Sequence, residues 1–233
     1  MKTSSMVKQI DWHMISLFKD LPDETLAFAL ESAFTRKVAA DEFMFFQGDP
    51  ARVSYVLLHG YIKLIQTTPK GEQVIMRYVS PGEEFGIIAV LREMNYPVTA
   101  QAVMDSEVAG WDDETLRELM LEPQIALNGM KILATRVQEF QQRTQELATE
   151  RMERRIARAL LRLAQQSGKK VPEGVHIDLR LTRQDLAELT GTSMYSVSRT
   201  LSQWESLGLI VCSREQVTIC LPHELVRIAE DLQ

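Results

Sequence analysis

Residues 181–201 constrain this chain of 233 residues more than any other segment. Thr182 stands at an N-cap position, and Asp185 follows it by three residues, which is the spacing of a capping box with a shorter acid than usual. Gly191 permits the left-handed turn that ends a helix, and Ser193 can cap a second helix directly behind it. The segment therefore predicts two helices joined by a tight turn.

The second predicted helix has two different faces. Val197, Leu201 and Trp204 recur at the helical interval and face a core. The opposite face carries polar side chains that can enter the major groove of DNA together: Tyr195, Ser198, Arg199 and Ser202. Arg199 is expected to read sequence, because a guanidinium can bind guanine O6 and N7 with two hydrogen bonds.

The remaining contacts are expected around the first helix. Arg183 and Gln184 are the candidate phosphate ligands, and Thr182 and Ser193 complete the expected DNA-binding set. Two helices with a glycine turn also occur in proteins that never contact DNA, so the surroundings must decide. Two β-rich runs, 207–211 and 216–221, predict a hairpin at the place where a winged helix has its wing.

A further helix is expected upstream of this motif. Its apolar face consists of Ile156, Ala159, Leu160 and Leu163. Its other face carries five arginines, most of which are expected to be solvated: Arg151, Arg154, Arg155, Arg158 and Arg162.

Charge is divided unevenly along the chain. The net charge of −6 is unusual for a protein that binds DNA, but residues 1–150 hold 14 Lys and Arg against 22 Asp and Glu, a net of −8. The remaining residues hold 12 against 10, a net of +2. Because phosphate neutralisation is local, a basic C-terminal module on an acidic partner domain is physically reasonable.

Composition narrows the class of protein. Hydrophobic residues make up 45% and charged residues 25%, as in ordinary globular proteins. No apolar run approaches the roughly 20 residues that span a bilayer, and residues 1–10 lack a signal-peptide core, so we expect a cytoplasmic protein that contacts no membrane. The two cysteines, Cys212 and Cys220, are too few for a disulfide framework and agree with a reducing compartment.

The first half of the chain changes from helical to β pattern. Residues 12–34 are expected to be helical, with Pro22 opening a turn within the segment. Between residues 43 and 111, short apolar runs alternate with Gly and Pro turns, which is typical of a β-roll, barrel or sandwich. The expected strands are 55–58, 61–65, 74–79, 99–103 and 107–111.

A long helix is expected next. Its apolar positions alternate spacings of three and four residues, as in a coiled coil: Met130, Leu133, Val137, Phe140, Thr144 and Leu147. The rest of the helix is polar, so the stripe is narrow and suits one partner helix, which a symmetric dimer supplies. The alternative is a single long helix packed on its own β-domain.

In this order, the three parts resemble the CRP/FNR family of bacterial transcription regulators. The resemblance is carried by residues 46–51, 58–64, 81–86 and 182–199. It implies an α+β fold with a jelly-roll-like β-roll sensor (1–118), a dimerisation helix (119–150) and a winged helix-turn-helix domain (151–233). It also implies a homodimer on a palindromic operator in double-stranded DNA, RNA polymerase as a partner, and Arg199 and Ser198 as base-reading residues.

Two departures from the family pattern bear on function. Tyr195 stands where a recognition-helix glutamate is common, so the half-site differs from the usual ones. In the effector pocket, expected at Gly86, Ile87, Val98 and Thr99, members that bind cyclic AMP have a glutamate and an arginine where this chain has Ile87 and Val98. Losing both anchors makes cyclic AMP an unlikely effector by this comparison.

Residues 96–102 look more like the branch that senses oxygen or nitrogen oxides. Its iron–sulfur members need an N-terminal cysteine cluster, which this chain lacks, so a [4Fe–4S] sensor is excluded. Haem is left open, with His59 and His13 as weak candidate axial ligands and no other metal site expected.

The leading hypothesis is therefore a homodimeric, sequence-specific transcription regulator whose β-roll senses a signal other than cyclic AMP, such as a gas at haem or another small molecule. The alternative is a ligand-binding regulatory subunit that acts on a partner protein. An enzyme is not expected, because no nucleophile–base pair, metal-spaced cluster or phosphate loop is present.

Overall fold

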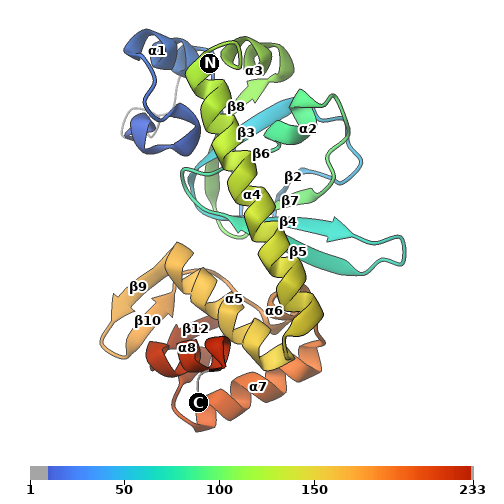
Figure 1. The fold of residues 1–233 in the computed structure, drawn as a ribbon, viewed down its shortest axis with the longest axis vertical. Coiled ribbons are helices and arrows are strands. Elements are labelled where there is room, and N and C mark those ends of the chain that lie inside the picture. Colours follow the sequence, from blue (N-terminus) through green and yellow to red (C-terminus); the bar gives the residue numbers. More distant parts are fainter. Residues whose placement is uncertain (1–9, 232–233) are drawn as a thin grey trace. The chain divides into compact units, whose positions relative to one another are not determined.

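A computed structural model describes residues 10–231 (Figure 1). The chain forms two compact units, and the division falls inside one long helix. The sensor unit comprises the residues up to Glu72 together with Met76–Glu139, and the C-terminal unit comprises Gln73–Ile75 and the residues from Phe140 onward. Together they give the expected α+β fold. Among the described residues, no helix combines the length and apolar character that crossing a bilayer demands.

The sensor unit contains two four-stranded antiparallel sheets, as the β-roll prediction requires. The first sheet has the order β1 (Phe34–Val38), β8 (Ser106–Asp112), β3 (Val53–His59), β6 (Glu84–Phe85). The second has the order β2 (Phe43–Phe45), β7 (Thr99–Ala102), β4 (Ile62–Thr67), β5 (Gln73–Val79). All five expected strands are present, and β1, β2 and β6 are additional.

Strand β3 shows why the sensor folds around two cores. Its side chains alternate between them, since successive residues of a strand point to opposite faces. Tyr55 and Leu57 pack between the two sheets, whereas Val56 and Leu58 pack toward the helices with Trp111. A strand buried on both faces has a continuous apolar run, which is the pattern of residues 55–58.

Residues 12–34 have the expected turn at Pro22, but only the part after Pro22 contains an α-helix. The segment folds as two short 3-10 turns, η1 (Trp12–Met14) and η2 (Ser16–Phe18), followed by α1 (Asp23–Glu31), and residue 34 already begins β1. Pro22 separates the turns from α1, because its fixed backbone suits a helix start and not a helix interior. Tertiary packing supplies the rest of the reason, since Trp12 and Phe18 are buried against Trp111 with ring centroids 6.3 and 5.3 Å from it.

Three helices complete the sensor side of the chain. They are α2 (Ile87–Leu91), α3 (Asp113–Leu119) and the long α4 (Pro123–Thr149), which the apolar spacing predicted. Asp112 starts α3 by accepting a hydrogen bond from the Thr115 amide at 2.9 Å. Asn128, on the first half of α4, is buried and donates to the carbonyl oxygens of Leu17 and Lys19 at 3.1 and 2.7 Å.

The C-terminal unit has four helices and one sheet among its described residues. The helices are α5 (Met152–Ser167), α6 (Arg183–Thr190), α7 (Met194–Ser206) and α8 (Pro222–Glu230). The sheet has the order β11 (Ile210–Ser213), β12 (Gln216–Ile219), β10 (Gly174–Ile177), β9 (Gly168–Val171). The expected helices and hairpin are present, and the β9–β10 hairpin is additional. The predicted apolar face of α5 is buried, with Ile156 and Leu160 fully enclosed.

We expect Asn128→Ala to lower the free energy of unfolding of the sensor unit by about 1–3 kcal/mol, because it leaves the carbonyl oxygens of Leu17 and Lys19 without their donor. Urea titration should show a lower midpoint at an unchanged slope. Gln138→Ala, at an exposed position of the same helix, is the control and should change little. Equal effects of the two variants would contradict the structural role of Asn128.

Candidate nucleic-acid interface

The start of α6 is held by the predicted capping box. The Thr182 hydroxyl oxygen accepts from the Asp185 amide at 3.0 Å, and the Asp185 carboxylate accepts from the Thr182 amide at 2.9 Å. The Thr182 hydroxyl also donates to that carboxylate at 2.6 Å. Asp185 is 7% exposed, so these bonds also satisfy a buried charge. The cap fixes where α6 begins.

The turn between α6 and α7 has the geometry that its glycine predicts. Gly191 adopts φ 60° and ψ 45°, the left-handed conformation that closes a helix with little strain only in glycine. Ser193 then caps α7, because its hydroxyl oxygen accepts from the Ser196 amide at 3.1 Å. The two helices are therefore joined by three residues whose conformations are individually fixed.

Helix α7 has the buried and exposed faces expected of a recognition helix. Val197, Leu201 and Trp204 are at most 4% exposed. Tyr195 on the other face is 75% exposed, and Arg199 is also exposed. Within the described part of the chain, the Arg199 guanidinium makes no hydrogen bond or ion pair. Its five N–H donors are thus available to an external acceptor.

The other expected DNA-binding residues lie around this helix. Ser202 and Ser193 are exposed on α7 and its cap, and Ser198 is half-buried beside Arg199. On α6, Arg183 and Gln184 are exposed, and the Gln184 amide donates to Glu188 at 2.8 Å. Thr182 is half-buried, and its hydroxyl is engaged in the capping box. Its main contribution is therefore to fix the start of α6.

The predicted wing is the β11–β12 hairpin. Ser213 pairs with Gln216, so the hairpin loop consists of Arg214 and Glu215. Glu215 has φ 60°, and its carboxylate accepts from the Arg180 guanidinium at 2.7 Å, which ties the loop tip to the loop between β10 and α6. Arg214 is exposed at the tip.

Both cysteines lie in or beside the wing and are half-buried free thiols. Burial raises the pKa of the Cys212 thiol, and the nearby Glu205 carboxylate adds to this effect. A raised pKa leaves little thiolate at neutral pH, so Cys212 has the character of a packing residue.

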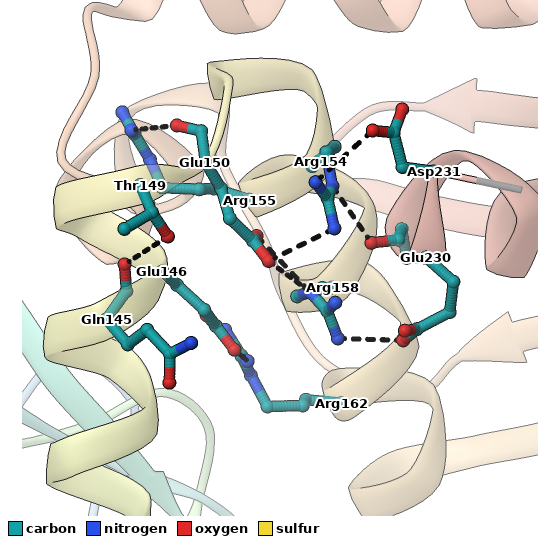
Figure 2. Close-up of polar contacts among 11 residues, drawn as sticks. Gln145, Glu146, Thr149, Glu150, Arg154, Arg155, Arg158, Arg162, Glu230 and Asp231 are labelled. Atoms are coloured by element: carbon teal, nitrogen blue, oxygen red, sulfur yellow. Dashed lines mark hydrogen bonds and ion pairs between the residues drawn. The ribbon is translucent and has the colours of Figure 1, made fainter.

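The expectation that most α5 arginines are solvated is wrong (Figure 2). Arg162 binds the buried Glu146 carboxylate at 2.7 Å, and Arg158 binds Glu150 at 3.1 Å. Arg154 and Arg155 donate to main-chain carbonyl oxygens at 3.2 and 3.0 Å. The remaining arginine of the five, Arg151, is exposed. Sequence periodicity marks these side chains as non-core, but it does not show which acceptors face them.

The residues expected to line the effector pocket lie around the starts of α2 and β7. Gly86 adopts φ 82° and precedes α2, and a side chain there would approach the ring of Tyr96 to 3.3 Å. Ile87 is buried, and Val98 and Thr99 are half-buried. The Thr99 hydroxyl oxygen accepts from the Gln47 amide at 2.9 Å. Neither the Ile87 nor the Val98 side chain offers a polar group to a ligand.

Aromatic packing fills the sensor beside these residues. Tyr96 stacks on Phe45 with ring centroids 3.7 Å apart, and Tyr55 stacks on Phe85 at 5.2 Å. The Tyr96 hydroxyl donates to the carbonyl oxygen of Val53 at 2.6 Å. Burial raises the pKa of Tyr96 to about 12, so it acts as a neutral hydrogen-bond donor at physiological pH.

The sensor also contains an ion network that the sequence did not single out. Arg136 of α4 donates to Glu83 at 2.8 Å and to Glu84 at 3.4 Å. Arg77 donates to Glu83 at 3.3 Å and to the carbonyl oxygen of Glu84 at 2.6 Å. Burial alone would lower the pKa of Arg136, but the two glutamates raise it. In the sequence, only the adjacent pair Glu83 and Glu84 could have indicated this network. Their partner Arg136 lies more than fifty residues away, and Arg77 lies on another strand.

Both candidate haem ligands are exposed on the single chain. His59 is exposed at the end of β3, and His13 is exposed in η1 with its Nε2 3.8 Å from the Asp23 carboxylate. Within residues 10–231, no group of three or more His, Cys, Asp or Glu side chains is placed to hold a metal ion.

The predicted stripe of α4 is exposed on the single chain. Its five large apolar side chains are between 46% and 66% exposed: Met130, Leu133, Val137, Phe140 and Leu147. Thr144, the polar member, donates its hydroxyl to the carbonyl oxygen of Phe140 at 2.8 Å and so adds no free polar group to the stripe.

Comparison with known proteins identifies the parts of the chain. Residues 35–122 match the cyclic nucleotide-binding domain, and residues 154–228 match the Crp-like helix-turn-helix domain. The chain is 30% identical to the cyclic AMP receptor protein of Thermus thermophilus, over 83% of this chain and 87% of that protein. It is 26% identical to the global nitrogen regulator of Synechococcus elongatus, over 90% of this chain and 93% of that protein.

A solved structure has the same fold. A transcriptional regulator of the CRP family from Thermus thermophilus aligns with a TM-score of 0.70 at 27% identity, covering 84% of this chain and 96% of that one. The sensor, the long helix and the winged helix-turn-helix thus follow one another in the same order as in that regulator. The chain belongs to the CRP/FNR family of DNA-binding transcription regulators, which are not enzymes.

Proposed function

We propose that this regulator acts as a homodimer that reads a palindromic operator, with DNA binding controlled by a signal in the β-roll other than cyclic AMP. The observation that carries the proposal is the exposed polar face of α7, where the Arg199 guanidinium has no partner among the described residues. An unpaired guanidinium on a capped recognition helix is suited to the edge of a guanine in the major groove.

The residues around Arg199 divide into two groups. Tyr195, Ser198 and Ser202 share its face of α7 and are proposed to contact base edges. Arg183 and Gln184, with the caps Thr182 and Ser193, are proposed to contact phosphates near the N-terminal ends of α6 and α7, where the helix dipole favours anions. At the position of Tyr195, many family members have a glutamate, whose carboxylate can accept a hydrogen bond from cytosine. Tyr195 would offer a phenol hydroxyl and an aromatic ring instead, so the preferred half-site sequence would differ.

The α4 stripe supports a dimer. Helix α4 runs for 27 residues, from Pro123 to Thr149, and carries its exposed apolar side chains on one narrow face. A monomer would leave this stripe in water, whereas a symmetry-related α4 would bury it by coiled-coil packing. Two copies of α7 would then be presented to half-sites one helical turn, about 34 Å, apart.

The signal is proposed to act through the sensor packing around α2 and α4. Ile87 and Val98 replace the polar anchors of a cyclic nucleotide, and the sequence of residues 96–102 favours the branch that senses oxygen or nitrogen oxides. We also expect RNA polymerase to be the protein partner of the DNA-bound dimer, and the cytoplasm, where bacterial DNA lies, to be its location. A change in α4 packing would alter the spacing of the two recognition helices.

We expect Arg199→Ala to abolish discrimination between the operator and random DNA, because a bidentate contact contributes about 1–3 kcal/mol at each half-site. Arg199→Lys retains the charge but not the fork, and should lose most of the same discrimination. Fluorescence anisotropy with an operator selected from random duplexes gives both affinities. If Arg199→Ala weakens binding equally for all sequences, Arg199 contacts phosphate and does not read bases.

Cyclic AMP should change neither stability nor operator affinity at physiological concentrations. Enclosing its phosphate beside Ile87 and Val98 without a cation would cost several kcal/mol, on the order of a buried unpaired charge. Thermal unfolding with increasing nucleotide measures this directly. A melting temperature that rises steadily with cyclic AMP concentration would show that the nucleotide binds the folded protein, and the proposal would fail.

Phe140→Glu should convert the dimer into monomers and abolish operator binding. Phe140 is 62% exposed near the middle of the stripe, so the variant places two like charges face to face in the proposed interface, at a cost of several kcal/mol, roughly. Sedimentation velocity at micromolar concentration measures the species. Gln138→Glu adds the same charge to the polar face of α4 and should remain dimeric. A dimeric Phe140→Glu protein would place the interface elsewhere.

A further inference from the structure

One arginine closes the ends of two helices in the C-terminal unit. Arg155 Nε donates to the carbonyl oxygen of Thr190 at 3.0 Å, and Nη2 donates to that of Gly191 at 3.3 Å. Its Nη1 donates to the carbonyl oxygen of Glu150 at 3.0 Å. Thr190 ends α6, and Glu150 directly follows α4. Carbonyl groups at helix ends lack intrahelical donors and carry partial negative charge, so a guanidinium is a strong partner for both ends.

The last turns of α4 contact the same turn directly. Arg143 Nη2 donates to the carbonyl oxygen of Leu189, one residue before the end of α6. The Leu147 side chain lies over Gly191, where an added Cβ would come within 2.9 Å of Leu147 Cδ2. Three side chains, from α4 and α5, therefore converge on the residues that join α6 to α7.

The corner between α4 and α5 is also held by ion pairs (Figure 2). Glu146 on α4 is 5% exposed on its side chain and binds Arg162 on α5 at 2.7 Å. Glu150 binds Arg158 at 3.1 Å, and Arg158 binds Glu230 of α8 at 2.8 Å. In the pairs with Glu146 and Glu150, one guanidinium nitrogen lies within hydrogen-bond distance of both carboxylate oxygens. Such partly buried ion pairs are screened less by solvent than exposed ones. The corner therefore has little freedom to bend.

The direction of α7 depends on this corner. Helix α7 begins at Met194, three residues beyond Gly191, and its first turn is fixed by the Ser193 cap. A displacement of α4 at its C-terminal end is thus passed to the α6–α7 turn through Arg155, and from there to Arg199. A flexible joint at residues 150–151 would absorb the displacement instead.

We propose that Arg155 is a positioning residue for DNA reading: it couples the last turns of α4 to the recognition helix, so that the two move as one body. The proposal rests on the homodimeric function above, because its biological consequence is the separation of two recognition helices. It assigns Arg155 no contact with DNA.

The chain offers a matched control for this role. Arg154 is the neighbouring residue on α5, with 24% of its side chain exposed, and it donates to the carbonyl oxygen of Ala229 in α8 at 3.2 Å. Like Arg155, it also contacts Glu150, with its guanidinium 3.4 Å from the carboxylate, so the two variants both lose a contact to the α4–α5 corner. Arg154→Met and Arg155→Met remove the same group from the same helix. Only Arg155→Met releases the α6–α7 turn. Arg155→Lys retains the charge without the planar fork and should be intermediate.

A distance measurement tests the coupling without DNA. Spin labels are placed at the exposed positions Gln142 on α4 and Gln203 on α7, in a chain carrying Cys212→Ser and Cys220→Ser. Labelled protein is mixed with excess unlabelled protein, so that only distances within one chain are recorded. Arg155→Met should broaden the distance distribution, and Arg154→Met should leave it as in the parent chain.

The spacing of operator half-sites tests the consequence. Affinities are measured for a selected operator and for versions with one base pair inserted or deleted between the half-sites. Arg155→Met should lose at least about tenfold in affinity for the selected spacing, as expected for lost charge-assisted hydrogen bonds, while the altered spacings lose less. The preference for one spacing then falls, which a general loss of stability does not produce.

The outcomes separate the two proposals. Unchanged distances and an unchanged spacing preference in Arg155→Met would overturn the role of Arg155, as would equal losses in Arg154→Met. Broadened distances with an unchanged spacing preference would overturn its role in DNA reading. If the parent chain selects no operator with two half-sites, the proposed homodimeric function fails, and the distance measurement still decides whether Arg155 couples α4 to α7.

Discussion

The C-terminal unit depends on satisfying the polar groups at helix ends. Each helix leaves unpaired N–H groups at its start and unpaired carbonyl groups at its end. Here the starts of α6 and α7 are closed by Thr182 and Ser193, and the ends of α4 and α6 are closed together by Arg155. Local caps fix where α6 and α7 begin, and the Arg155 guanidinium binds the C-terminal ends of both α4 and α6. The helix-turn-helix is therefore attached directly to the last turn of α4.

Charge has a structural use in both units. In the sensor, Arg136 of α4 is surrounded by Glu83 and Glu84, so the first half of α4 is fixed to the turn before α2. In the C-terminal unit, Glu146 at the other end of α4 binds Arg162. The same helix thus carries an arginine that binds carboxylates in one unit and a carboxylate that binds an arginine in the other. Neither ion pair involves the exposed apolar stripe of α4, which remains accessible for the proposed dimer contact.

Local chemistry explains which features could be predicted from the sequence. The capping box at Thr182, the glycine turn at Gly191 and the faces of α7 depend on neighbours within a few residues, and the structure confirms them. The 3-10 turns after Trp12 and the partners of Arg155 depend on packing between distant segments. Thr190 lies 35 residues from Arg155, and no periodicity relates an arginine to a main-chain carbonyl. Strands β9 and β10 are only four residues long and carry few apolar residues, so they do not stand out in the sequence.

The internal pairing of the α5 arginines has a consequence for how ionic strength acts on the protein. An arginine that is already paired with a carboxylate of the protein neutralises DNA phosphates poorly. Its approach therefore releases few counterions from the DNA. If the proposed function holds, the exposed arginines Arg183 on α6 and Arg199 on α7 would carry a larger share of the contacts to phosphates and bases. A regulator built in this way would gain less from non-specific electrostatic attraction, and its occupancy of a promoter would then respond less steeply to changes in cellular salt.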